Sequence, residues 1–141
     1  MAPVPSDRDL AAVDAVRAAW VAAVAAGNSA ALSDLLTDDY EVWAHGAEPI
    51  HGPAAAAAAM SAALARFHIE QSFEAIETVV SGDWAFQRGI ERMTVTPRDG
   101  GTAQSMAQRA LLILRRGHDG QRRYARGMTN GLPATPGPPR A

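Results

Sequence analysis

The fold of this chain is decided by residues 69–130, which read IEQSFEAIETVVSGDWAFQRGIERMTVTPRDGGTAQSMAQRALLILRRGHDGQRRYARGMTN. From Ile69 onward the spacing of apolar residues approaches two, which is the period of a β-strand. Three glycine-containing turns divide the stretch, and two of them contain Asp-Gly, a strong hairpin signal. We therefore expect four strands joined as an antiparallel meander, at about 69–80, 84–96, 102–116 and 122–130.

The first part of the chain has helical spacing instead. Ser6 and Asp9 resemble a capping box, and apolar residues follow at steps of three and four, at Leu10, Val13, Val16, Trp20 and Val24. This spacing places one apolar stripe along a helix that Gly27 ends.

Two shorter helices and one strand are expected between these regions. Asn28 can cap a second helix that contains the leucines up to Leu36 and ends at residues 38–39. Residues 40–43 then have the composition of a short strand. A third helix, 54–66, follows Pro53, a residue that a helix accepts in its first turn.

This order of elements predicts an α+β fold, with three N-terminal helices packed on one face of a strongly curved antiparallel or mixed sheet. Such a sheet forms a cone with an apolar pocket, the usual kind of ligand site. We expect one domain over residues 8–131. The flanks are expected to be a flexible N-terminus, 1–7, and a disordered proline-rich tail, 132–141.

The composition excludes several classes of function. The 141 residues include no cysteine, so disulfides and thiolate chemistry are absent. The formal net charge of −2 provides no basic field for nucleic acid. No segment approaches the ~20 apolar residues of a membrane span, and the polar N-terminus indicates a cytoplasmic protein. With neither a glycine-rich phosphate motif nor a metal-ligand cluster, we expect no cofactor and no metal.

Five short segments carry a resemblance to a known family: 38–43 (DDYEVW), 49–52 (PIHG), 82–85 (GDWA), 115–120 (RRGHDG) and 124–130 (YARGMTN). In this order they resemble the SnoaL-like, ketosteroid-isomerase-like domains of the nuclear transport factor 2-like superfamily, which have a cystatin-like fold. The resemblance implies one fold with many activities, among them isomerases, cyclases, dehydratases and non-catalytic association domains. It also implies a homodimer through the open face of the sheet.

The chain departs from the ketosteroid isomerase pattern at three places. That chemistry needs a carboxylate base together with a tyrosine and a protonated aspartic acid. The family's tyrosine position falls at about Trp20, and its base position falls near Ala44 or His45. The strand at 102–116, where the protonated acid belongs, contains no Asp or Glu. A standard ketosteroid isomerase is therefore not expected.

His45 is the candidate catalytic residue, because imidazole can take and give a proton near neutral pH. The alternative for His45 is a loop histidine that bonds to backbone. The candidate ligand-pocket residues are Trp20, Trp43, Met60, Phe86, Arg88, Gln108 and Asn130. The sequence does not decide whether Arg88 faces the pocket or the outer surface. Gln108 and its neighbour Arg109 must face opposite sides.

Two hypotheses of function follow. In the first, a cofactor-independent isomerase, cyclase or dehydratase acts on a small apolar carbonyl compound, such as a polyketide-like or steroid-like molecule. In the second, the chain is a non-catalytic ligand-binding or dimerisation domain. The sequence leaves open whether the chain is an enzyme at all.

Overall fold

The computed structural model describes residues 4–133. The elements follow the order α1 (Asp7–Ala25), α2 (Ser29–Ser33), β1 (Leu36–Trp43), β2 (Ile50–His51), α3 (Pro53–Arg66), β3 (Phe67–Ser81), β4 (Trp84–Pro97), β5 (Gln104–Arg116) and β6 (Arg122–Gly131). The predicted α+β class is confirmed, and all four long strands are present. Most of the tail that we predicted to be disordered, residues 134–141, lies outside the described residues.

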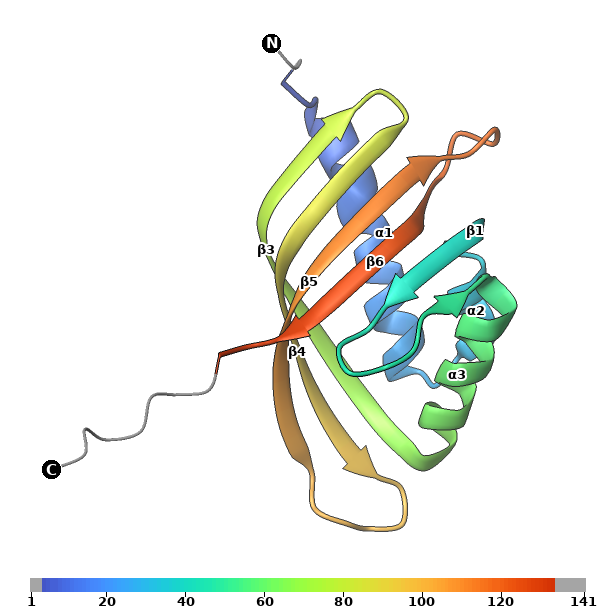
Figure 1. Cartoon of the computed structure of the whole chain (residues 1–141), viewed down its shortest axis with the longest axis vertical. Helices are drawn as coiled ribbons and strands as arrows, with labels where there is room; N and C mark the ends of the chain where they lie inside the picture. The colour runs from blue at the N-terminus through green and yellow to red at the C-terminus, as the bar shows by residue number, and fades with distance from the viewer. Residues whose placement is uncertain (1–3, 134–141) are drawn as a thin grey trace, which may run out of the picture.

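The six strands form one mixed sheet with the order β2-β1-β6-β5-β4-β3. The β3–β4, β4–β5 and β5–β6 pairs are antiparallel, as a meander requires. The exception is β1, which runs parallel to β6. The sheet bends strongly along its long strands and remains open rather than closing into a barrel (Figure 1).

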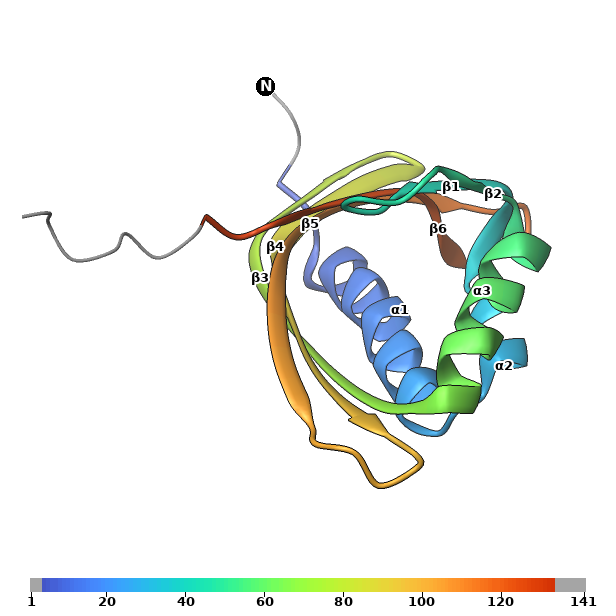
Figure 2. The same ribbon diagram turned by 60° about the horizontal axis from the view of Figure 1, so that its bottom comes forward.

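The helices cover the concave face of this sheet. Helix α1 lies inside the bend, while α2 and α3 lie opposite the long strands (Figure 2). Ser6 begins α1 as predicted, because its hydroxyl oxygen accepts a hydrogen bond from the Asp9 amide at 3.1 Å. Pro53 begins α3 as predicted. The three helices and the curved sheet together enclose the two core clusters described below, which is the predicted packing of helices on a strongly curved sheet.

The segment between α1 and α3 differs from the prediction. Helix α2 ends at Ser33, so Leu36 lies in β1, and Asp38 and Asp39 are strand residues rather than the end of a helix. The reason is the parallel partner: Leu36 pairs with Tyr124, which is distant in sequence. Strand β2, whose two residues lie between the predicted short strand and the predicted third helix, was also missed.

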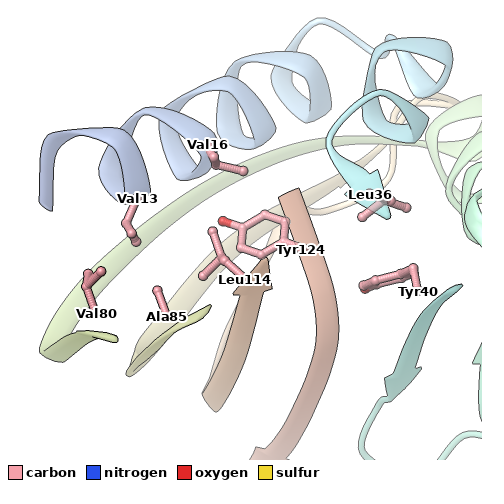
Figure 3. Packing of buried hydrophobic residues seen from close by; sticks show 8 residues of the cluster. All are labelled: Val13, Val16, Leu36, Tyr40, Val80, Ala85, Leu114 and Tyr124. Carbon is pink, nitrogen blue, oxygen red and sulfur yellow. The ribbon is translucent and has the colours of Figure 1, made fainter. Parts of the chain in front are cut away.

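The core consists of two clusters of buried apolar side chains. One joins α1 to β1 and to the β3–β6 meander, and it contains Val13, Val16, Leu36, Tyr40, Val80, Ala85, Leu114 and Tyr124. In Figure 3 the valines of α1 face the strand residues, and the ring of Tyr124 lies beside Leu114. The second cluster joins α1, α2 and α3 to the start of β3, through Ala23, Val24, Leu32, Leu64 and Ile69.

The bend of the sheet coincides with a bulge in β3. The register between β3 and β4 shifts between Ala75 and Glu77. Opposite the bulge lies Gly89, where an added Cβ would collide with the backbone carbonyl oxygen of Glu74. A bulge increases local twist and bend, and glycine permits the close backbone approach that this bend requires.

No helix within residues 4–133 has the length and apolar character needed to span a membrane.

Candidate functional site

A buried ion pair lies in the interior between α1 and the concave face of the sheet. Arg17 Nη2 of α1 lies 3.0 Å from Glu91 Oε2 of β4, and both side chains are only 10% exposed. Gln108 of β5 donates from Nε2 to Glu91 Oε1 at 2.8 Å. Both oxygens of the carboxylate are therefore hydrogen-bonded, which a charge in a desolvated interior requires.

The pair is positioned by two regular periodicities. Arg17 lies four residues after Val13 and three before Trp20, so it shares the buried stripe of α1. Glu91 lies on the buried face of β4, which it shares with Ala85, Gln87 and Gly89. Gln108 is next to Glu91 in the β4–β5 register, so both side chains point to the same side.

Aromatic rings surround the guanidinium of Arg17. Its Cζ lies 4.3 Å from the centroid of the Phe73 ring and 6.0 Å from that of Tyr124. Trp20 meets Tyr124 edge to face, with centroids 5.9 Å apart. A cation over a ring face is stabilised by the quadrupole of the ring, so this aromatic wall accommodates the charge while excluding solvent.

Two buried tyrosines lie near this ion pair. Burial raises the pKa of Tyr124 to about 12, and Arg17 acts in the opposite direction. Burial also raises the pKa of Tyr40 to about 12, with a smaller contribution from Tyr124. Both phenols therefore remain protonated at neutral pH, where they can donate hydrogen bonds.

Several buried polar atoms of this region have no partner among the described residues. They include the Tyr124 hydroxyl, Arg17 Nε and Gln87 Oε1. The amide nitrogen of Gln87 is satisfied, because it donates to Asp14 Oδ1 at 3.1 Å and to Thr78 Oγ1 at 3.0 Å. A buried polar group without a partner is unusual and costs about 1–3 kcal/mol.

We call Arg17, Glu91, Gln108 and Tyr124 the interior polar cluster. It offers two unused hydrogen-bond donors, on Arg17 and Tyr124, beside a carboxylate. Donors of this kind can bind the oxygen of an organic molecule, and in a low-dielectric site they stabilise negative charge that develops on that oxygen.

Three of the sequence-predicted pocket residues lie in the interior. Trp20 packs against both core clusters, and Met60 packs against the second. Gln108 is part of the interior polar cluster, which settles the choice between it and Arg109. These three are brought onto the same side of the sheet.

The other predicted pocket residues lie on the outer face. This corrects the prediction for Trp43, Phe86 and Asn130, and for Arg88 it is the outer-surface alternative. Phe86 and Arg88 alternate with the buried Ala85 and Gln87, so their side chains point away from α1. Arg88 instead pairs with Glu77 on β3. The same alternation places two further residues on the outer face, Trp43 and Asn130.

His45 lies after the end of β1 and is exposed. Its Nδ1 accepts a hydrogen bond from the Gly131 amide at 3.2 Å, and its own amide donates to Thr129 Oγ1 at 3.1 Å. The histidine thus binds backbone at the end of β6, which was the alternative reading of its sequence position. No hydrogen bond or ion pair among the described residues connects it to the interior polar cluster.

Sequence reasoning missed Arg17, Glu91 and Tyr124. The signal for Arg17 was a charge inside the apolar stripe of the first helix, where a buried cation requires a partner. Glu91 shares its face of β4 with the small residues Ala85 and Gly89, which was the available signal that this face is the inner one.

The outer face carries an apolar groove of about 250 Å³. Trp43, Met128 and Leu111 lie in register across β1, β6 and β5, and they are 52%, 46% and 39% exposed. Ile113 adds to the floor of the groove, and Arg126 lies at its edge.

A broader groove of about 1030 Å³ lies between α2 and two of the hairpin turns, the one that follows β3 and the one that follows β5. Two of its arginines are already paired: Arg115 binds both oxygens of Asp39, and Arg123 binds both oxygens of Asp119. Within residues 4–133, no three His, Asp or Glu side chains form a group that could hold a metal ion.

The sequence of residues 17–126 matches the family model of the SnoaL-like domain. The chain belongs to the SnoaL-like domain family. The match begins at Arg17 and includes the whole interior polar cluster of this SnoaL-like domain. No curated protein matches its sequence.

Solved structures agree with this assignment. A conserved protein from Planctomyces limnophilus is 29% identical to this SnoaL-like domain, with a TM-score of 0.83, covering 90% of this chain and 100% of that chain. A ketosteroid isomerase-like protein from Erwinia carotovora is 25% identical, with a TM-score of 0.79 and coverage of 92% and 100%. A nuclear transport factor 2-like protein from Salmonella enterica, 13% identical, shares the fold with a TM-score of 0.77 and coverage of 89% and 91%.

Proposed function

We propose that this SnoaL-like domain binds a small, mostly apolar molecule in its interior and holds that molecule by an oxygen atom. The observation that carries this proposal is the pair of buried donors without a protein partner, the Tyr124 hydroxyl and Arg17 Nε. An oxygen of a bound carbonyl or hydroxyl compound would accept these hydrogen bonds and remove the cost of leaving them unmade.

Charge further limits the ligand. Arg17 and Glu91 neutralise each other, so an ionised ligand would bring an uncompensated charge into the interior. Burying such a charge is unfavourable. The ligand class that fits is therefore an uncharged carbonyl or hydroxyl compound, such as a polyketide-like or steroid-like molecule.

Proton transfer is the chemistry that the same groups support. Glu91 would remove a proton from the carbon next to a ligand carbonyl, while Tyr124 and Arg17 would donate hydrogen bonds to the carbonyl oxygen. Returning the proton to another carbon would complete an isomerisation without a cofactor. The base in this proposal is Glu91 instead of His45, because only Glu91 belongs to the interior polar cluster.

Binding can be tested with a panel of uncharged ketones, lactones and alcohols, using thermal shift and calorimetry. Tyr124→Phe removes one of the donors. It should raise the Kd of a ligand found in this way by about 3- to 10-fold, which corresponds to the usual contribution of a neutral hydrogen bond. Arg88→Gln is the matched control, because it changes a polar side chain on the outer face of β4. Equal affinities for wild type, Tyr124→Phe and Arg88→Gln would exclude the interior polar cluster as the binding site.

Catalysis can be tested with the same ligands in deuterated water. The wild-type chain should exchange the hydrogens next to the carbonyl, and Glu91→Gln should lose about 10²-fold or more of this activity. Because Glu91→Gln also breaks the ion pair, Tyr124→Phe provides a second variant that leaves Arg17 and Glu91 in place. If the chain binds a ligand but exchanges none of its hydrogens, the chain is a non-catalytic binding protein.

A second candidate function is self-association, which the outer apolar groove favours. Exposed apolar patches of this kind commonly mark interfaces. We propose that a second copy of the chain covers Trp43, Leu111 and Met128, giving a homodimer through the open sheet face.

Light scattering at micromolar concentrations should give twice the 14.8 kDa chain mass. Leu111→Glu, which places a charge in the middle of the groove, should give the monomer. Ser61→Glu, at an exposed position of α3 on the opposite side of the molecule from the open sheet face, serves as the control. A wild-type monomer, or a Leu111→Glu dimer, would contradict this candidate function.

A further inference from the structure

The end of β6 contains an Asn-Gly sequence in an unusual environment. Asn130 is exposed, and Gly131 is its C-terminal neighbour. In this sequence the backbone nitrogen of glycine can attack the side-chain amide of asparagine, because glycine has no side chain to hinder the approach. The attack requires that the glycine nitrogen lose its proton.

A base lies beside that nitrogen. The Gly131 amide donates to His45 Nδ1 at 3.2 Å. Its proton therefore points at an unprotonated imidazole nitrogen. Strand β1 ends at Trp43, which pairs with Met128 of β6. Gly131 lies beyond this last pair, so its amide bonds to the His45 side chain instead of to the backbone of β1.

We propose that Asn130 is a self-modification site, at which His45 acts as the general base for deamidation. In the first step His45 Nδ1 accepts the proton of the Gly131 amide, and the nitrogen bonds to Cγ of Asn130. The bond from Cγ to the side-chain nitrogen then breaks, and ammonia leaves with the proton that His45 returns. Water opens the resulting cyclic imide to aspartate or isoaspartate, so no oxidant or cofactor is needed.

The step requires the end of β6 to open locally. The Gln108–Gly131 pair is the last of the β5–β6 ladder, where a strand can open locally at the least cost. The proton of Gly131 is directed to a side chain rather than to another strand. The backbone rotation that brings Asn130 Cγ to the nitrogen therefore opens only the end of the ladder, at the Arg109–Asn130 and Gln108–Gly131 pairs.

The product changes the charge of the outer face. Asn130 is in register with Arg109 on β5, and Arg109 forms no ion pair with another residue in the described range 4–133. A carboxylate at position 130 adds a negative charge directly across from this arginine, where opposite charges on neighbouring strands attract.

The test follows the purified full chain by mass spectrometry during incubation at neutral pH. Trypsin releases residues 127–140 as one peptide that contains only this asparagine. The other asparagine is Asn28, whose Oδ1 accepts the Ala31 amide at 3.1 Å, and it serves as the internal control. Asn130 should gain the mass of deamidation while Asn28 keeps its amide.

Two substitutions at position 45 test the base. His45→Gln keeps a hydrogen-bond acceptor without a useful base, and His45→Phe keeps a ring without either. Both should slow conversion of Asn130 by at least about tenfold, since general-base assistance is commonly worth more. Gly131→Ala should slow it as well, and its added Cβ would meet the His45 ring only at 3.7 Å, an ordinary contact. Circular dichroism establishes that each variant is folded.

Two results would overturn the proposal. One is an Asn130 amide that persists in the folded chain while a synthetic peptide of residues 127–133 deamidates. The other is conversion in both His45 variants at the wild-type rate or faster.

Discussion

The same pair of residue types, arginine and glutamate, occurs on both faces of strand β4 with different surroundings. On the concave face, Arg17 and Glu91 are each 10% exposed and are enclosed by Phe73 and Tyr124. On the outer face, Arg88 pairs with Glu77 at 2.8 Å, with side chains 52% and 43% exposed. The two ion pairs have similar lengths, so distance does not distinguish them.

What distinguishes them is the cost of removing one partner. Water can solvate Arg88 if Glu77 is lost, whereas Arg17 would remain charged in an apolar interior. A buried ion pair is therefore fragile without being a large source of stability. Its presence in a small core is consistent with a role in binding, which is the role that we propose.

The largest effect is expected from breaking the interior pair. Glu91→Gln should lower the free energy of unfolding by about 3–5 kcal/mol, because the charge of Arg17 is left uncompensated. Urea unfolding followed by tryptophan fluorescence measures the change. The double variant Arg17→Met/Glu91→Met should recover most of the loss, since it removes both charges and retains apolar volume. If the Glu91→Gln chain is as stable as wild type, the two ion pairs do not differ in the cost of removing one partner.

The second effect concerns the buried phenols at alkaline pH. The pKa of Tyr124 rises from 10.0 to about 12 in the folded chain through burial. The unfolded chain therefore loses its proton first, so this contribution is fully present below pH 10 and is lost as the pH rises toward 12. At one pKa unit per 1.4 kcal/mol, the loss is about 2–3 kcal/mol.

Tyr124→Phe should make the stability of the chain less sensitive to pH in this range, with Tyr40 providing the remaining slope. Unfolding curves at a series of alkaline pH values measure it. An unchanged slope in Tyr124→Phe would mean that this phenol does not titrate with a raised pKa.

A smaller effect is expected at the edge of the outer face. Arg115 binds both oxygens of Asp39, and this contact is the main cause that lowers the Asp39 pKa from 3.8 to about 2. The stabilisation is present above pH 3.8 and is lost as the pH falls toward 2. Because Asp39 is half exposed, Asp39→Asn should cost only about 0.5–1 kcal/mol at neutral pH. The neighbouring substitution Asp38→Asn is the control and should change stability less.

The smallest effect is expected from the outer ion pairs. At concentrations where the chain is monomeric, Arg88→Gln and Arg92→Gln should each change the free energy of unfolding by less than about 1 kcal/mol, and the change should decrease at high salt. Arg92 pairs with Glu74 at 2.8 Å, but the side chains are 55% and 61% exposed. A loss comparable to that of Glu91→Gln would show that the outer face is desolvated, as it would be within a dimer.

The fold was largely predictable because its signals are local. The glycine-containing turns mark the hairpins, and Ser6 and Pro53 mark helix starts that the structure confirms. Strand β1 was predicted too short because its first residues become a strand only through pairing with Tyr124 on β6. That partner is distant in sequence, so no local pattern contains it.

The interior polar cluster was only partly predictable for a related reason. Alternation along β4 shows that Arg88 and Glu91 face opposite sides, but it does not show which side receives helix α1. The position of α1 decides this, and it places Glu91 inside. Arg17 was the available clue, because a charge in a buried stripe requires a partner from another element.

The bulge of β3 has a consequence for how this interior could change during evolution. The extra residue in β3 lies opposite Gly89, and a side chain at position 89 would collide with the β3 backbone at Glu74, so the bulge and the glycine depend on each other. A descendant with a larger or smaller interior would have to shift both along the hairpin together. Sites 75–77 and 89 should therefore covary as one unit among relatives, while the outer residues of β4 vary independently.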